Sequence, residues 1–282
     1  MLKVQDVRPS PILGSWYSAN PKELTGQIEK YVDSAEIYAV PGRIVGLVAP
    51  HAGHRYSGRT AGYAYRTVFK QSYDLVVVVA PLHSYFPAPI LTSAHKYYGT
   101  PLGKVAVAQD YVNTLNGFLK KQGIVELYPL ANDEEHSIEI QLPFLQYCLA
   151  GSFELLPVMV RPKDLALTNA LGLALSETIQ ECSALLIAST DLSHFYTKSE
   201  AYRFDQEMLS QIEQFSPAGV LKAEESGSGF ACGAGALATV MAASRASRAN
   251  AAKVLHYSTS AEETGDSNSV VGYGAAVFFE QE

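Results

Sequence analysis

Three shortages in this sequence exclude several classes of protein. Its 282 residues include only three cysteines, too few and too scattered for a disulfide framework, so we expect a protein of the reducing cytoplasm. No apolar run approaches the roughly 18–20 residues of a membrane span, and the N-terminus lacks the apolar segment of a secretory signal. Basic residues are also outnumbered: the net charge of −7 argues against nucleic acid or an anionic membrane as the main partner.

The rest of the composition is ordinary for a soluble globular protein, with 48% hydrophobic and 17% charged residues. The length suits one large domain or two small ones. Because no internal repeat, low-complexity tract or Pro/Gly/Ser-rich linker divides the chain, we predict a single domain over residues 1–282.

Short apolar runs alternate with helix-like stretches along the chain. We predict strands at Ile44–Ala49, Leu75–Ala80, Ile90–Thr92, Val105–Ala108, Leu155–Val160, Ala184–Ala188 and Val270–Phe279. We predict helices at Pro21–Tyr31, Ser57–Phe69, Asp110–Lys121, Ser137–Leu149, Pro162–Cys182, Ser199–Gln214 and Gly233–Ala246. Several strands are continuously hydrophobic, which indicates cover on both faces. The pattern predicts a layered α/β fold with a central mixed or mostly parallel sheet.

Three of the predicted strands are followed closely by a histidine. His51 and His83 each come shortly after an Ala-Pro pair that ends an apolar run, and His194 follows the third run together with Asp191. In α/β folds, ligands collect in the crevice beyond the carboxyl ends of the strands. We therefore expect these side chains to share one crevice.

The two matching histidines favour a metal site. Neutral imidazoles close to one another are what a divalent transition metal binds. A lone histidine more often bonds a loop carbonyl, and this alternative applies to His51 and to His54, which follows three residues later. Ser57 is predicted to cap the next helix.

Asp191 and His194 lie three residues apart. They can act as a base with an orienting acid, or supply another metal ligand. Equally, Asp191 can cap the following turn while His194 satisfies a local carbonyl.

Cys232 precedes an Ala-rich helix and follows a glycine-rich run. A helix N-terminus lowers the pKa of a thiol, so we expect a thiolate that binds a metal or attacks an electrophile. The alternative is a small buried hydrophobe, the usual role of a free cysteine. We assign Cys148 and Cys182 to packing.

Two further segments contribute candidates for the walls of the pocket. His136 lies beside Glu135, and Ser137 after it is a candidate helix cap. Pro143 is expected to kink that helix or to end its first segment. A structural capping network would explain His136 and its acidic neighbours nearly as well as a pocket does. Trp16 and Tyr17 follow Gly14 and can line a cleft, although a lone tryptophan more often belongs to the core.

The ordered set of motifs resembles the Memo family, whose human member mediates receptor-driven cell motility. The motifs are GSWY at 14–17, PHAG at 50–53, YSG at 56–58, PLH at 81–83, EHSIE at 135–139, DLSH at 191–194, CG at 232–233, TGD at 264–266 and VGY at 271–273. They span nearly the whole chain. The resemblance implies a fold like that of the class III extradiol dioxygenases, which are non-haem iron enzymes that open catechol rings.

Carried over position by position, the resemblance makes His51, His83 and Cys232 the metal ligands. It puts His194 in the place of the dioxygenase acid/base histidine, with Asp191 beside it. Cys232 stands where the dioxygenases have a carboxylate. Other departures are His54 in place of a tyrosine, Leu82 in place of a small or polar residue, and a longer segment at 258–266. The substrate specificity of the dioxygenases is therefore not transferred.

Three functions follow from these residues. The first is a redox-metal protein with a dioxygenase-like site, an oxidoreductase if it turns over, holding Fe²⁺ or alternatively copper or zinc. The second is a non-catalytic protein that uses a vestigial cleft to bind a peptide, a small ligand or a metal. The third, ranked last, makes Cys232 a nucleophile with His194 as its base, and leaves His51 and His83 without a role.

Overall fold

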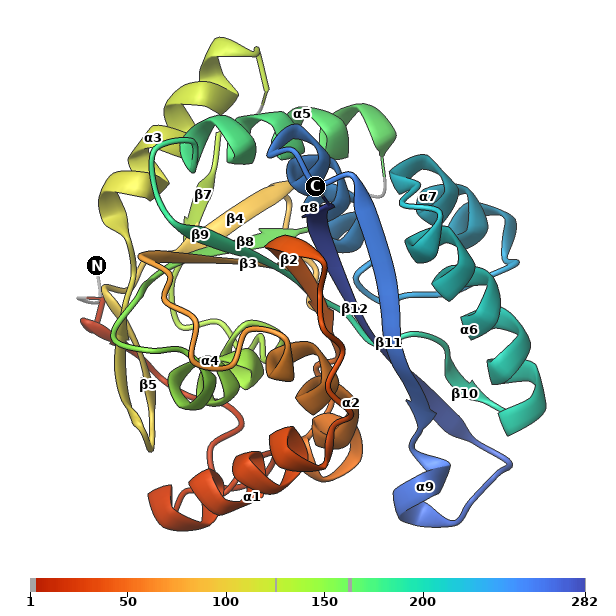
Figure 1. Ribbon diagram of the computed structural model, residues 1–282. Coiled ribbons are helices and arrows are strands. Elements are labelled where there is room, and N and C mark those ends of the chain that lie inside the picture. Colours follow the sequence, from red (N-terminus) through yellow and green to blue (C-terminus); the bar gives the residue numbers. More distant parts are fainter. Residues whose placement is uncertain (1–3, 125, 162–163, 282) are drawn as a thin grey trace.

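The computed structural model describes residues 4–124, 126–161 and 164–281. Within these ranges, nine strands form a central sheet in the order β10-β12-β2-β9-β3-β8-β4-β7, with β11 paired to β12 (Figure 1). A second, three-stranded sheet has the order β1-β5-β6. The bounds of the strands are β1 Val7–Arg8, β2 Gly42–Ala49, β3 Leu75–Pro81, β4 Ile90–Ser93, β5 Tyr97–Thr100, β6 Gly103–Ala106, β7 Tyr128–Leu130, β8 Glu154–Val160, β9 Ala184–Ser189, β10 His194–Tyr196, β11 Ala251–Thr259 and β12 Val270–Gln281.

The central sheet is mixed. Strands β2, β9, β3 and β8 are parallel neighbours, whereas β12 runs antiparallel to β2, and β4 antiparallel to β8. The carboxyl ends of β2, β9 and β3 therefore lie side by side at one edge of the sheet. The predicted layered α/β fold with a mixed or mostly parallel sheet is confirmed.

Helices cover both faces of this sheet (Figure 1). Helices α1, α2 and α4 pack on one face, and α3, α5 and α8 on the other, with α6 and α7 joining the second layer. The helices are α1 Pro21–Ser34, α2 His54–Arg66, α3 Gln109–Lys121, α4 Leu142–Cys148, α5 Leu165–Thr178, α6 Lys198–Glu213, α7 Pro217–Ser226, α8 Ala234–Ala246 and α9 Ala261–Thr264, with a 3-10 turn η1 at Glu139–Gln141.

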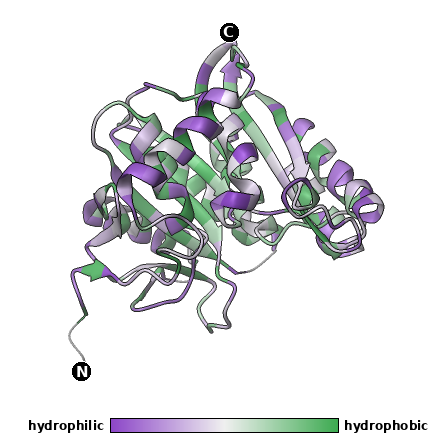
Figure 2. Ribbon diagram, turned by 90° about the horizontal axis from the view of Figure 1, so that it is seen from below, coloured by the Kyte–Doolittle hydropathy of each residue, from purple (hydrophilic) through white to green (hydrophobic). Residues whose placement is uncertain are grey.

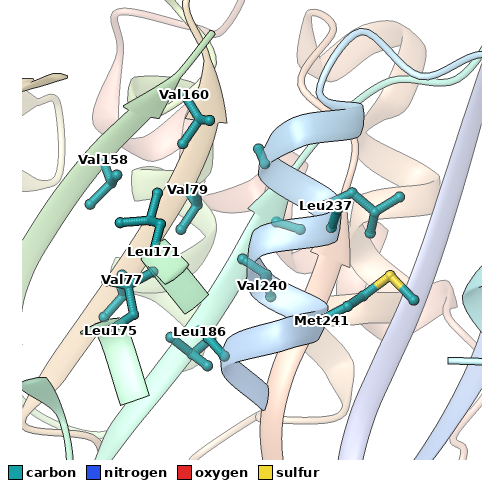
Figure 3. Close-up of a cluster of buried hydrophobic side chains, with 14 of the residues drawn as sticks. Val77, Val79, Val158, Val160, Leu171, Leu175, Leu186, Leu237, Val240 and Met241 are labelled. Atoms are coloured by element: carbon teal, nitrogen blue, oxygen red, sulfur yellow. The ribbon is translucent and has the colours of Figure 1, made fainter. Parts of the chain in front are cut away.

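Strand β3 illustrates why the continuous apolar runs are central strands. Its Val77 and Val79 face the layer of α3, α5 and α8, whereas Val76 and Val78 face the layer of α1, α2 and α4. Because side chains alternate along a strand, burial on both faces requires an unbroken apolar run. Figure 2 shows mostly green strands in the centre and helices that carry many purple segments around them, and Figure 3 shows the side chains of one cluster.

Small residues bring α5 and α8 close together. A Cβ on Gly172 of α5 would lie only 2.6 Å from the Cβ of Ala242 on α8. The small side chains of α8, the helix that begins after Cys232, thus let it approach α5 closely. The predicted helix at Gly233–Ala246 is present as α8, whereas the start of the predicted helix Pro162–Cys182 lies outside the described residues.

Several local predictions are wrong in detail. Ser57 lies inside α2 and bonds the carbonyl of Ala52 at 2.9 Å, so it caps nothing. Ser137 is not a cap either, because its hydroxyl donates to the carbonyl of Pro81 at 3.0 Å. The helix expected from Ser137 onward is a 3-10 turn followed by α4, and Pro143 lies in the first turn of α4. Here Pro143 separates two segments, one of the two outcomes expected of it.

None of the helices in the described ranges is both long and apolar enough to cross a membrane. The predicted absence of a membrane-spanning helix therefore holds for these residues.

Candidate metal centre

Three imidazoles converge beyond the carboxyl ends of the parallel strands. His51 follows β2, His83 follows β3, and His136 lies in the loop before η1. One ring nitrogen from each lies within 4.8 Å of the others. The rings of His83 and His136 stack with centroids 4.8 Å apart, and His51 meets each of them edge-on at 5.3 Å. His136, expected only as a pocket wall, is thus a potential ligand.

His51 is held from two sides. Its backbone N–H donates to Asp191 Oδ1 at 2.7 Å, and its ring Nδ1 lies 3.1 Å from Ser189 Oγ. Its other ring nitrogen, Nε2, lies 3.1 Å from Cys232 Sγ. Burial holds the pKa of His51 well below its ordinary value, so the imidazole is neutral at pH 7.

His83 is oriented by a buried carboxylate. Glu135 accepts the backbone N–H of His83 at 2.7 Å and faces its Nδ1 at 3.0 Å. The hydrogen bond to Glu135 raises the pKa of His83. With Nδ1 engaged in this way, Nε2 is the ring nitrogen left for a metal, and carboxylate–histidine pairs of this kind commonly orient metal ligands. The sequence did not link Glu135 to His83, because the two are 52 residues apart.

Cys232 lies just before α8, as predicted, but its thiol is not activated. Its sulfur accepts the backbone N–H of Asp191 at 3.3 Å and lies 3.8 Å from Thr190 Oγ1. Burial, and then the charge of Asp191, raise the pKa of Cys232 above its ordinary value. The expected thiolate is therefore wrong for the metal-free protein, because burial outweighs the helix dipole. The other cysteines, Cys148 and Cys182, contact the two apolar clusters as expected.

Asp191 and His194 do not bond to each other as base and orienting acid. The carboxylate of Asp191 accepts backbone N–H groups of the loop at His51 and Ala52, and burial raises the pKa of Asp191 to about 7. His194 Nδ1 lies 2.8 Å from the carbonyl of Leu192, and burial lowers the pKa of His194. This leaves Nε2 of a neutral His194 available for proton transfer.

The remaining pocket candidates separate into two groups. Trp16 borders the cluster, with its ring 4.3 Å from that of His136. Tyr17 instead donates to Glu139 at 2.6 Å, and His54 Nε2 bonds the carbonyl of Ile140 at 3.1 Å. Tyr17 and His54 are each 3% exposed and bond residues of η1, the turn that follows His136.

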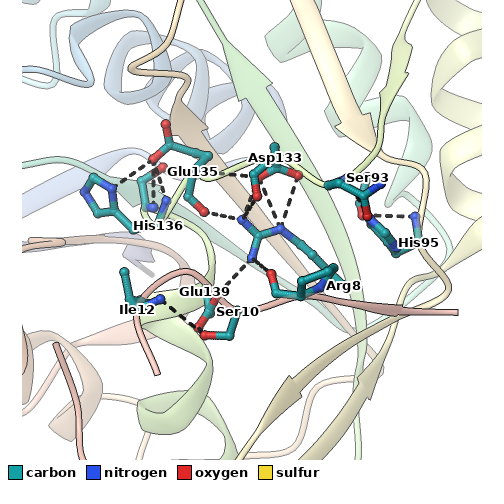
Figure 4. A network of polar contacts seen from close by, with 12 residues as sticks. Arg8, Ser10, Ile12, Ser93, His95, Asp133, Glu135, His136 and Glu139 are labelled. Carbon is teal, nitrogen blue, oxygen red and sulfur yellow. Dashed lines mark hydrogen bonds and ion pairs between the residues drawn. The ribbon is translucent and has the colours of Figure 1, made fainter. Parts of the chain in front are cut away.

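A buried arginine fixes the loop that carries His136 (Figure 4). Arg8 of β1 pairs with Asp133 at 2.6 Å and with Glu139 at 2.7 Å, and it also donates to the carbonyl of Glu135. All three partners lie on the segment that holds His136. The short strand at the N-terminus thus contributes to the geometry of the site.

A hollow of about 810 Å³ lies elsewhere on the surface, at the amino ends of the parallel strands. Arg43, Tyr73 and Ser183 are among its lining residues, and none of the clustered histidines is. The histidine cluster and this hollow are therefore at opposite ends of the sheet.

The donor set fits a transition metal. Two imidazole nitrogens with a third imidazole or a thiol beside them suit iron, copper or zinc better than the hard cations that prefer oxygen. In each of His51 and His83, Nδ1 already faces a protein partner, which leaves Nε2 for a metal.

The fold and the site together define a class of protein: an α/β protein with imidazoles and a thiol clustered beyond the ends of its parallel strands. The chain belongs to the Memo family: the model of Memo-like proteins matches residues 8–277. It is 32% identical to a MEMO1 family protein of Methanopyrus kandleri, over 96% of this chain and 98% of that protein. It is 31% identical to one from Methanosarcina mazei and 29% to one from Nitrosopumilus maritimus, each over 96% of this chain and 99% of the relative.

Proposed function

We propose that this protein binds a redox-active metal in a dioxygenase-like site, with His51, His83 and Cys232 as ligands. The observation that carries the proposal is the convergence of His51, His83 and His136 within 4.8 Å, with Cys232 Sγ 3.1 Å from His51 Nε2. Fe²⁺ is the proposed metal, with copper as the redox-active alternative; zinc, which has no redox chemistry, is the alternative for a site that only binds metal.

Two potential third ligands compete in this site. His136 stacks on His83, whereas Cys232 contacts His51 directly. We favour Cys232, because its sulfur already lies 3.1 Å from His51 Nε2, and a metal bound there would take the place of the thiol proton and balance the thiolate charge that burial disfavours. His136 then lies beside the centre, with the ring of Trp16 against its own.

As an enzyme, the protein would be an oxidoreductase acting on a small substrate. A bound redox metal supplies electron transfer and oxygen activation. His194, neutral and with Nδ1 facing the carbonyl of Leu192, would take up or release a proton through Nε2 beside the centre. Asp191 would act by holding the loop of His51 through backbone N–H groups.

Metal titration of selected variants tests the ligand set. Protein purified anaerobically without a histidine tag would be titrated with ferrous iron and with cuprous copper. We expect the double variant His51→Ala/His83→Ala to lose tight binding while remaining folded. Cys232→Ser should weaken metal binding by at least about 100-fold. Substitution of residues that only orient the ligands typically weakens binding by about 10–100-fold, so a loss of this size indicates a ligand.

Two matched variants set the scale of that result. His136→Gln should weaken binding by less than about tenfold, and His256→Gln, which removes an imidazole stacked on Tyr63 instead, should leave it unchanged. A double variant that binds metal like the parent would refute the metal centre. If His136→Gln had a larger effect than Cys232→Ser, the ligands would be the three imidazoles.

A non-catalytic binding protein is the second candidate function. The observation in its favour is that aromatic side chains are exposed beside site histidines: Phe195, next to His194, is 75% exposed, and Trp16 on His136 is 37% exposed. Such a surface would bind a peptide or a small ligand. Oxygen consumption by the iron-loaded protein, with candidate catechols and without them, separates turnover from binding alone.

A further inference from the structure

A chain of buried hydrogen bonds ends on the ring of His51. Ser189, the last residue of β9, lies between three partners: its Oγ is 3.1 Å from His51 Nδ1, 2.6 Å from the carbonyl oxygen of Ser137 and 2.8 Å from Gln141 Nε2. Gln141 Nε2 also donates to the carbonyl of Pro50 at 3.0 Å. Ser189, Ser137 and Gln141 are all at least 99% buried, so water does not compete for these bonds.

The two carbonyls at the ends of this chain determine the direction of every hydrogen bond in it. A carbonyl can only accept, so Pro50 requires the amide nitrogen of Gln141 to face it, and the second N–H of that amide then points to Ser189. Tyr65 supports the same orientation, because its hydroxyl donates to Gln141 Oε1 at 2.8 Å. The carbonyl of Ser137 likewise requires the single hydroxyl proton of Ser189.

Ser189 consequently has only lone pairs left for His51. We infer that Ser189, oriented by Gln141, is a positioning residue that holds His51 as the Nδ1–H tautomer. In this tautomer Nδ1 donates to Ser189 Oγ, and Nε2 keeps its lone pair and faces Cys232 Sγ, 3.1 Å away. The hydroxyl does for His51 what the carboxylate of Glu135 does for His83, but without a negative charge.

The consequence for metal binding rests on the proposed function, whereas the tautomer does not. A lone pair on Nε2 is ready to bind a metal without a prior proton shift. The other tautomer would carry its proton on the atom that must act as ligand. Loss of such an orienting partner typically weakens metal binding by about 10–100-fold.

Nitrogen NMR of the metal-free protein reads the tautomer directly. Protein labelled with ¹⁵N in its seven histidines would be treated with a chelator, and long-range ¹H–¹⁵N correlations recorded at pH 7.5. The signals of His51 are assigned by their absence in His51→Gln. We expect the Nδ1–H pattern in the parent and a shift towards Nε2–H in Ser189→Ala, accompanied by about 10–100-fold weaker iron binding.

Tyr65→Phe is the matched control, because it removes a hydrogen bond from the same chain but leaves Pro50 to orient Gln141. It should keep the Nδ1–H pattern. An Nε2–H pattern in the parent would overturn the inference even if Ser189→Ala failed to fold. An equal tautomer shift in Tyr65→Phe and Ser189→Ala would also overturn it. Should the parent show Nδ1–H but bind no metal, the positioning role would stand and the proposed function would fail.

Discussion

His54 is a histidine enclosed by the core on the face of α1, α2 and α4. It is 3% exposed, its ring packs edge-on against Phe144 at 4.9 Å, and Nε2 bonds the carbonyl of Ile140. In the described part of the chain, Nδ1 has no hydrogen-bond partner. Burial lowers the pKa of His54 to about 4, so the folded protein holds this ring neutral.

This burial predicts that acid destabilises the protein through His54. The unfolded chain takes up the proton near pH 6.5 and the folded protein only near pH 4, so the stability present above pH 6.5 is lost as the pH falls between these values. Between pH 7 and pH 4.5, the free energy of unfolding should fall by about 2–3 kcal/mol more in the metal-free parent than in His54→Phe. Urea unfolding at both pH values measures this. If the free energy of unfolding fell equally in the two proteins, the pKa of His54 would not be lowered in the folded state, and the prediction would be wrong.

At the scale of elements, the two-residue strand β1 depends on one ion-pair network. Arg8 is 3% exposed and bonds Asp133 and Glu139, while its guanidinium lies 5.1 Å from the ring centroid of Tyr98. β1 thereby connects the small sheet to the loop of His136, as Figure 4 shows around Arg8. The backbone pairing of a two-residue strand would not provide this connection alone.

Removal of this arginine should destabilise the protein strongly. Arg8→Met leaves Asp133 and Glu139 buried without their cation, which typically costs about 3–5 kcal/mol. The matched control is Arg43→Met, which breaks an ion pair to Glu280 at 2.9 Å with a side chain that is 55% exposed. That change should cost less than about 1 kcal/mol. Urea denaturation of both variants tests the contrast, and similar losses would contradict it.

At the scale of the whole molecule, a metal bound by residues from separate elements should stabilise the complete fold. The proposed ligands follow β2 and β3 and precede α8, so unfolding must separate them. At a free metal concentration about 100 times the Kd, binding adds about 2.7 kcal/mol. For a chain of this size that raises Tm by roughly 5 °C.

Thermal unfolding with and without ferrous iron, under anaerobic conditions, measures this effect. The same titration on His51→Ala/His83→Ala should leave Tm unchanged. An equal rise in the double variant would show that iron stabilises the fold through other groups.

Periodicity and strand ends were enough to predict the main elements and four residues near the site. His51, His83, Asp191 and His194 were expected beyond strand ends and are found there, because parallel strands deliver their carboxyl ends to one edge. Strand β11 was missed, because its residues are partly exposed without a two-residue alternation. Its pairing with β12 alone makes it a strand.

The sequence by itself determined the layered α/β fold, a central sheet that is mixed or mostly parallel, and the histidines at its edge, since these follow from local hydrophobic patterns. Only the tertiary structure decided which groups surround them. Glu135 on His83, Ser189 on His51 and the stacking of His136 join residues far apart in the chain. Tertiary burial also overturned the expected thiolate at Cys232, because the dielectric around a side chain depends on what packs over it.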